Sequence, residues 1–271
     1  MVFNKKKVGV YDYEYFQSSE INKDTLVFIH GFGADSRFQW SEQLKEFSKE
    51  YHLIVPNLIH FGGSTSNEAS YSVDFQTRGI KLLLDSLNIK SAHVVGISYG
   101  GTIAADFAYK FPDATKKVVL VDAPVGFHSD SLFQAQMKRL NIESAADLLL
   151  PTEYEAAKKL MEEAYYGKQF FPKYVAKDII DPMFVKNRDK KMKLLEKIAH
   201  PTDSILSYPI ELNKEILIVW GREDQIVPLE VGQQLDAFYK NSKLVIFEKS
   251  KHFTPAEYPK EFNEKVLEFL K

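Results

Sequence analysis

The sequence predicts one α/β domain with a mostly parallel sheet flanked by helices, interrupted by a helical insertion. Short apolar runs alternate with helical patterns in both parts of the chain, which is the rhythm of βαβ units. Between about residues 127 and 208 the alternation stops, and helical patterns follow one another without a buried strand. We therefore expect a core domain formed by residues 1–126 and 209–271, with residues 127–208 inserted as a helical cap.

The individual elements follow from apolar periodicity. Strands buried on both faces are continuous apolar runs, and these occur at 25–29, 52–55, 93–97, 118–121, 216–220 and 244–247, after a Tyr- and Val-rich strand at 7–16. Core helices with an apolar residue at helical spacing are expected at 36–50, 73–87, 100–111, 228–240 and 256–270. The expected cap helices are 131–140, 143–149, 152–165 and 187–199.

Composition narrows the classes of function. The 271 residues are 45% hydrophobic, enough for one sizeable core, and a net charge of -2 gives no basic face for nucleic acid. With no cysteine in the chain, disulfides, thiol nucleophiles and thiolate metal sites are excluded. No apolar run approaches the ~20 residues of a membrane span. The basic start of the chain lacks a following apolar stretch, so we expect no signal peptide and a cytoplasmic location.

The motif that carries chemistry is Gly96-Ile97-Ser98-Tyr99-Gly100. By itself G-x-S-x-G is a weak signal, but here it follows an expected buried strand and opens an expected helix. In that context the serine occupies a sharp, strained turn that lifts its Oγ above the sheet edge, and the glycines let helix and strand approach closely. Ser98 is therefore the candidate nucleophile.

A serine hydroxyl needs a base to accept its proton, and the chain has seven histidines. His252 lies in the loop after strand 244–247, which projects from the same sheet edge as Ser98. His60, in another loop, is the second candidate for a polar role in the site. The remaining histidines are poorer candidates because they begin strands, belong to a structural turn or lie in or beside the insertion: His52, His93, His30, His128 and His200.

The base needs an acid that orients its ring and stabilises its charge. Asp224 follows strand 216–220, and Glu223 and Asp122 are the alternatives. The order Ser98, Asp224, His252 is the order of nucleophile, acid and base in α/β-hydrolases. The oxyanion formed in acyl transfer is expected on two backbone N–H groups, those of Phe32 and Tyr99.

With these motifs in place, the chain resembles the α/β-hydrolase superfamily over nearly its whole length. The resemblance rests on His30-Gly31-Phe32-Gly33, Gly96–Gly101, Gly221–Pro228 and His252, in that order. It is closest to serine carboxylesterases and lipases, including monoacylglycerol lipase-like members, and to carbon–carbon bond hydrolases. One departure is Asn57-Leu58-Ile59-His60, where the family often has an aspartate at the first position.

The resemblance implies a serine esterase or lipase that cleaves carboxylic esters with short or medium acyl chains, without a metal or organic cofactor. Ser98, rather than an aspartate, argues against dehalogenase or epoxide hydrolase chemistry. The expected contacts with a small-molecule ester come from residues beside the triad and in the cap: Val227, Phe253, Phe170 and Phe171, with Tyr165, Tyr166, Met183 and Phe184 as further candidates.

Two alternatives remain open at this stage. A carbon–carbon bond hydrolase uses the same triad but needs cationic groups for a substrate carboxylate, for which Arg78 and Arg188 are candidates. A ligand-binding or signalling protein with slow turnover can also occupy this scaffold, because a fold does not determine a function.

Overall fold

The computed structural model of the chain describes residues 3–126, 130–167, 169, 171–199, 205 and 209–271. Its centre is a nine-stranded sheet with the order β1-β2-β4-β3-β6-β7-β8-β9, in which β5 pairs with β2. The strands are β1 (Phe3–Val8), β2 (Tyr11–Gln17), β3 (Thr25–Ile29), β4 (His52–Pro56), β5 (Thr65–Ser66), β6 (Ala92–Ile97), β7 (Thr115–Val121), β8 (Ile216–Gly221) and β9 (Ser242–Phe247). From β4 to β9 along the sheet, neighbouring strands are parallel, which confirms the predicted fold class.

The start of the chain corrects one expectation. A single strand at 7–16 is wrong, because β1 and β2 form an antiparallel hairpin in which Val8 pairs with Tyr11. Gly9, with a φ of 57°, occupies the turn between them. A glycine adopts this left-handed conformation without a steric penalty, so a tight turn forms between the two strands. Because apolar residues alternate on both sides of this turn, the sequence pattern alone reads as one strand.

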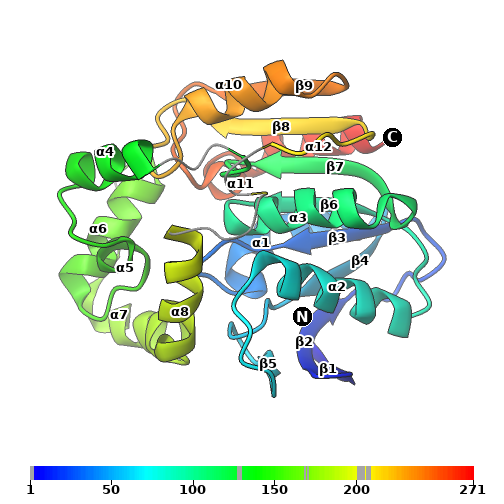
Figure 1. The fold of residues 1–271 in the computed structure, drawn as a ribbon, viewed down its shortest axis with the longest axis horizontal. Coiled ribbons are helices and arrows are strands. Elements are labelled where there is room, and N and C mark those ends of the chain that lie inside the picture. Colours follow the sequence, from blue (N-terminus) through cyan, green and yellow to red (C-terminus); the bar gives the residue numbers. More distant parts are fainter. Residues whose placement is uncertain (1–2, 127–129, 168, 170, 200–204, 206–208) are drawn as a thin grey trace.

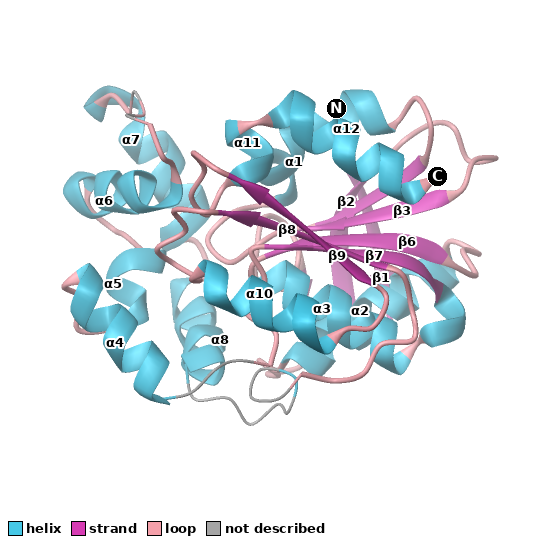
Figure 2. Cartoon of the chain, turned by 90° about the horizontal axis from the view of Figure 1, so that it is seen from above, coloured by secondary structure: helices cyan, strands magenta, loops and turns pink. Residues whose placement is uncertain are grey.

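Helices cover both faces of the sheet (Figure 2). On one face lie α1 (Ser36–Phe47), α11 (Thr254–Glu257) and α12 (Pro259–Leu270), and on the other lie α2 (Val73–Ser86), α3 (Tyr99–Lys110) and α10 (Leu229–Phe238). A short 3-10 turn, η1, spans Pro112–Ala114. Trp40, Phe47 and Phe262 are fully buried against the first face. Strands β3, β4, β6 and β8 are buried along their whole length, as expected for apolar runs between two helical layers.

The remaining helices gather beyond the end of the sheet toward which the arrows of β7 and β8 point (Figure 1). They are α4 (Asp130–Leu140), α5 (Ala145–Leu149), α6 (Tyr154–Ala164), α7 (Lys173–Ile180), a π-helical turn η2 (Asp181–Val185) and α8 (Arg188–Ala199). Leu150, Ile180 and Phe184 belong to a separate apolar cluster within this layer. We propose that these helices are the cap expected from the sequence.

The sequence did not predict α7 and η2. Pro182 lies inside this segment and cannot donate a backbone hydrogen bond. The Lys186 N–H instead bonds to the Asp181 carbonyl five residues earlier, at 2.8 Å, so the helix continues through a wider turn. In this turn the side chains repeat at a longer interval than the ~3.6 residues of an α-helix, so a search for α-helical periodicity does not find the segment.

One lysine is buried between the cap and the core. Lys191 of α8 is only 1% exposed, and its Nζ donates a hydrogen bond of 2.5 Å to the Met183 carbonyl. The same ammonium lies 5.2 Å from the ring centroid of Phe61 in a core loop. Burial lowers the pKa of Lys191 to about 8. Lys191 thus links α8, η2 and the core, but burial removes water from its amino group and destabilises the charged form.

Among the residues that the structure describes, no helix combines the length and the apolar character needed to cross a membrane.

Candidate active site

Ser98 occupies the turn between β6 and α3. Its backbone has φ 54° and ψ -126°, a conformation that residues with a side chain rarely adopt. The Ser98 N–H donates a hydrogen bond of 2.8 Å to the carbonyl of Val121 at the end of β7. A strained residue persists only where its surroundings hold it, and such residues are frequent at active sites. The turn therefore has the strained geometry expected of a nucleophile elbow.

The glycines beside Ser98 are required by close backbone packing. A Cβ atom on Gly96 would lie 2.1 Å from the Gly100 carbonyl oxygen. A Cβ on Gly100 would lie 2.4 Å from the carbonyl oxygens of both Ile29 and His30. The spacing of the motif thus follows from the contact of α3 with β6 and β3, and this contact fixes the position of Ser98.

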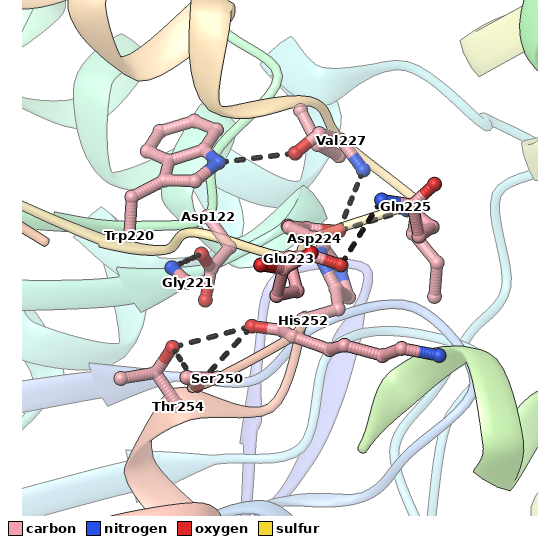
Figure 3. A network of polar contacts seen from close by, with 12 residues as sticks. Asp122, Trp220, Gly221, Glu223, Asp224, Gln225, Val227, Ser250, His252 and Thr254 are labelled. Atoms are coloured by element: carbon pink, nitrogen blue, oxygen red, sulfur yellow. Dashed lines mark hydrogen bonds and ion pairs between the residues drawn. The ribbon is translucent and has the colours of Figure 1, made fainter. Parts of the chain in front are cut away.

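His252 and Asp224 form a hydrogen-bonded pair at the same edge. The distance between His252 Nδ1 and Asp224 Oδ2 is 2.7 Å, and both residues are buried. The other oxygen of Asp224 accepts hydrogen bonds from the N–H groups of Ile226 and Val227, at 2.8 and 3.0 Å. With a carboxylate on Nδ1, the proton resides on that nitrogen and Nε2 is left as the base. Figure 3 shows this pair and the turn around Asp224.

Asp122, an alternative acid, lies beside this pair. It is fully buried, and its Oδ1 accepts a hydrogen bond of 3.0 Å from the Gly221 N–H. One donor atom from each of Asp122, Asp224 and His252 lies within 4.8 Å of the others. Burial, reinforced by the charge of Asp224, holds the pKa of Asp122 well above its ordinary value. The raised pKa disfavours the ionised form of Asp122, and the carboxylate that bonds to His252 is that of Asp224.

Glu223, the second alternative acid, is exposed. Its backbone N–H donates to the Ser250 carbonyl at 2.9 Å, so Glu223 stabilises the loop that precedes His252 and makes no described bond to the histidine ring. Among the described contacts, only Asp224 joins a carboxylate to His252.

The turn after β3 approaches the serine from the other side. A Cβ on Gly31 would lie 3.2 Å from Ser98 Cβ, so the backbone leading to Phe32 lies close to Ser98. His30 holds this turn: Nε2 accepts from the Leu58 N–H at 2.9 Å, and Nδ1 donates to the Gly31 carbonyl at 2.8 Å. Burial lowers the pKa of His30 to about 4, so the ring is neutral and fits this structural role.

Tyr99 follows Ser98 as the first residue of α3, where the backbone N–H groups of a helix point outward from its N-terminus. Its ring packs edge-on against that of Phe32, with centroids 6.4 Å apart. Tyr99 and Phe32 thus lie close to each other beside Ser98, and the two donors of an oxyanion site must converge in this way on one oxygen. We propose this role for their N–H groups.

Of the other histidines, none that the structure describes lines the cavity that contains Ser98. His60 packs on Tyr71 with ring centroids 5.3 Å apart and does not contribute to the cavity that contains Ser98. Burial lowers its pKa to about 4. His52 and His93 begin β4 and β6 at the opposite edge of the sheet, as expected. His128 and His200 lie outside the described residues.

Asn57 explains the departure from the family pattern. Its Oδ1 accepts from the backbone N–H and the hydroxyl of Ser36, at 2.8 and 2.6 Å. Its Nδ2 donates to Glu14 at 2.7 Å, and the same glutamate oxygen accepts from the Gly63 N–H. An aspartate at position 57 would set two carboxylates against each other, so Glu14 and Asn57 form a matched pair that orders the loop.

Ser98 and His252 both line one cavity of about 340 Å³ between the core and the cap helices. Its walls are largely apolar. Among the described residues they comprise Gly31, Phe32, Gly33, Ala34, Phe38, Gln39, Ile97, Leu149, Ala157, Leu160, Met161, Ala164, Tyr165, Phe171, Ile179, Met183, Phe184, Ile226 and Phe253. The cavity lies at the lower end of the ~300–1,000 Å³ of small-molecule sites.

Some of the expected substrate-contact residues line the cavity and others do not. The cavity wall includes Phe253 and Phe171, together with Tyr165, Met183 and Phe184. Val227 is not part of the cavity wall: its carbonyl accepts from the Trp220 indole at 3.0 Å, and the neighbouring Ile226 lines the cavity. Tyr166 is 50% exposed and does not line the cavity. Phe170 lies outside the described residues.

No lysine, arginine, aspartate or glutamate lines the cavity in the part of the chain that the structure describes. Arg188 donates instead to the Leu150 carbonyl within the cap. Arg78 pairs with Asp74 on the surface of α2, with an Nε–Oδ2 distance of 2.9 Å. Neither arginine is therefore placed to receive a carboxylate beside Ser98.

Comparison with known proteins gives a family match and several full-length relatives. The family described as alpha/beta hydrolase fold matches residues 24–259. A 2-hydroxy-6-oxononadienedioate/2-hydroxy-6-oxononatrienedioate hydrolase of Paraburkholderia phymatum is 27% identical, covering 94% of this chain and 90% of that protein. The human monoacylglycerol lipase ABHD6 is 24% identical, over 96% of this chain and 80% of that protein.

Among solved structures, that of a putative lipase from Acinetobacter baumannii AYE superposes with a TM-score of 0.84 and 26% identity, covering 99% of this chain and 90% of the other. Proteins named as lipases and one named as a dienedioate hydrolase thus match this chain at similar identity.

Proposed function

Because the chain belongs to the α/β-hydrolase family, we propose that it is a serine hydrolase that cleaves carboxylic esters with short or medium acyl chains. The observation that carries this proposal is the hydrogen bond of 2.7 Å between His252 and Asp224 beside a cavity that also contains Ser98. Nucleophile, base and acid then act in the roles that acyl transfer requires.

The reaction proceeds in two steps. Ser98 Oγ attacks the ester carbonyl while His252 Nε2 accepts the hydroxyl proton, and the oxyanion forms on the N–H groups of Phe32 and Tyr99. The alcohol leaves with the proton from His252, which gives an acyl-enzyme on Ser98. Water then repeats the sequence: His252 accepts a proton from it, hydroxide adds to the acyl carbon, and Ser98 leaves with the returned proton. Asp224 stabilises the imidazolium in both steps.

The substrate class follows from the cavity. An apolar wall with Gln39 as its polar member beyond the reacting groups suits an aliphatic acyl chain. A volume of about 340 Å³ suits short and medium chains. Because the described wall contains no cationic side chain, it favours a neutral ester over a dienoate carboxylate, which would enter an apolar cavity without a counter-charge.

A series of p-nitrophenyl esters from acetate to palmitate tests this proposal. We expect hydrolysis that rises from acetate to about the octanoate, falls for palmitate, and is lost in Ser98→Ala. A maximum at palmitate would refute the limit on chain length.

A carbon–carbon bond hydrolase is the second candidate, because the Paraburkholderia relative is named for hydrolysis of 2-hydroxy-6-oxononadienedioate, a keto dicarboxylate that contains no ester. A vinylogous ketone that carries a carboxylate distinguishes the two: faster cleavage of this compound than of any ester would replace the ester proposal. Stoichiometric labelling of Ser98 without turnover of either substrate would favour a binding role on a hydrolase scaffold.

A further inference from the structure

The loop that carries His252 is bonded directly to the cap. The Phe253 N–H donates a hydrogen bond of 3.0 Å to the Ala164 carbonyl, at the end of α6. On the other side of His252, Lys251 Nζ donates to the Glu162 carbonyl at 2.5 Å. The last carbonyls of a helix have no partner within the helix, so α6 ends on the two neighbours of the catalytic base.

A single carboxylate completes this junction. Glu257, the last residue of α11, accepts from the Lys251 N–H at 2.8 Å and from the Ser250 hydroxyl at 2.6 Å through one oxygen. Its other oxygen accepts from the Tyr166 N–H, just beyond α6, at 2.5 Å. Hydrogen bonds to an ionised acceptor are about twice as strong as neutral ones. Glu257 therefore bonds to both the histidine loop and the cap.

The same junction forms part of the cavity wall. The rings of Tyr165 and Phe253 meet edge to face with centroids 5.1 Å apart, and both line the cavity. One comes from the cap and the other follows His252 directly. A displacement of the end of α6 would therefore change both the wall and the backbone on either side of the base.

We propose that Glu257 is a positioning residue, which fixes His252 toward Ser98 and sets the Tyr165–Phe253 wall by joining the histidine loop to the end of α6. This inference rests on the proposed hydrolase function of the site. The nearby ion pair between Lys251 and Glu163 is not expected to have this role. Its charged atoms lie 3.9 Å apart and both side chains are partly exposed, so it contributes little to the stability of the junction. The carboxylate of Glu257, by contrast, accepts two backbone N–H groups whose positions it determines.

Glu257→Ala and Glu257→Gln test the proposal against Glu261→Ala, an exposed glutamate on α12. A misplacement of about 1 Å lowers catalysis by up to ~100-fold, so we expect Glu257→Ala to reduce kcat for p-nitrophenyl acetate on the order of 10- to 100-fold with a smaller change in KM. Glu257→Gln retains one acceptor oxygen and should recover part of that loss. Glu261→Ala should match the wild type.

The downfield 1H NMR resonance of the His252 Nδ1 proton supplies a second readout. We expect it to broaden or disappear in Glu257→Ala and to persist in Glu261→Ala, with thermal unfolding showing that each variant is folded. Wild-type kcat and an unchanged resonance in both folded Glu257 variants would overturn the proposal. If the wild type hydrolyses no ester, the proposed function fails, but the resonance still decides whether Glu257 positions His252. If Glu257→Ala does not fold, Glu257→Gln supplies both measurements.

Discussion

The catalytic edge of the core and the cap wall of the cavity are built from different contacts. In the core, Ser98 bonds through its N–H to the Val121 carbonyl, and the carboxylate of Asp224 accepts from the N–H groups of Ile226 and Val227. In the cap, apolar side chains such as Ala157 of α6 face the cavity. Backbone contacts tolerate little change, whereas apolar surfaces accept substitutions of similar volume. We therefore expect the chemistry to depend on the core and the selectivity to depend on the cap.

Asp224→Asn should produce the largest effect. The amide can hold the imidazole in the wrong tautomer and cannot stabilise its charge, so kcat for p-nitrophenyl acetate should fall on the order of 10⁴-fold. Steady-state kinetics of the folded variant measure this. Glu223→Gln, the exposed neighbour, is the matched control and should keep the wild-type rate. A loss in Glu223→Gln with activity retained in Asp224→Asn would reverse the assignment of the acid.

Two glycine substitutions compare the core and the cap directly. In Gly100→Ala the new Cβ would lie 2.4 Å from two carbonyl oxygens, and we expect a loss of about 3–5 kcal/mol in the free energy of unfolding. In Gly167→Ala the Cβ meets nothing within 4 Å, so the change should stay within about 0.5 kcal/mol. Urea denaturation measures both. Equal effects would remove the contrast between the regions.

Ala157→Leu should alter selectivity while leaving the chemistry intact. Ala157 is buried and lines the cavity, so the larger side chain fills space needed by the acyl chain. We expect kcat/KM for p-nitrophenyl octanoate to fall by about 10- to 100-fold, with acetate hydrolysis unchanged within error. Glu155→Leu, exposed on the same helix, is the control. Equal losses for both esters would show that this part of the cap also supports the catalytic residues.

Lys191→Met should have the smallest effect, and its sign depends on pH. The pKa of Lys191 is lowered to about 8 from 10.5, so between these pH values the unfolded chain binds a proton that the folded chain has released. The wild type therefore gains stability from pH 8 to 10.5, and below pH 8 it bears the full cost of the buried charge.

Methionine removes that cost, so at pH 7 Lys191→Met should be more stable than the wild type by about 1–2 kcal/mol. This difference should shrink as the pH rises toward 10.5. Urea titrations at several pH values check it. A pH-independent difference would show that the contacts of the ammonium with Met183 and Phe61 balance its desolvation, and a variant less stable at pH 7 would show that they outweigh it.

The sequence predicts the core well because its signals are local. The spacing of Gly96, Ser98 and Gly100 reflects the close packing of one strand–turn–helix unit on itself and on β3. Uninterrupted apolar runs indicate strands buried on both faces. Asp224 and His252 could be found because each follows such a strand, and parallel strands bring their carboxyl ends to one edge.

Other features depend on contacts that no local pattern records. Ile226 lines the cavity and Val227 does not, although the N–H groups of both bond to Asp224, so the sequence does not reveal which side chain faces the cavity. Glu257 acts across the junction between two regions distant in sequence, with partners at Lys251 and Tyr166. Pro182 conceals the helical period of its segment. Such features need the tertiary structure.

Labelling with a fluorophosphonate tests the central claim most directly, because the probe reacts only with an activated serine. We expect one covalent adduct, located by peptide mass spectrometry on Ser98, absent in Ser98→Ala and formed more slowly in His252→Ala. An adduct on a different serine, or none on the folded protein, would contradict the assignment of Ser98 as the nucleophile.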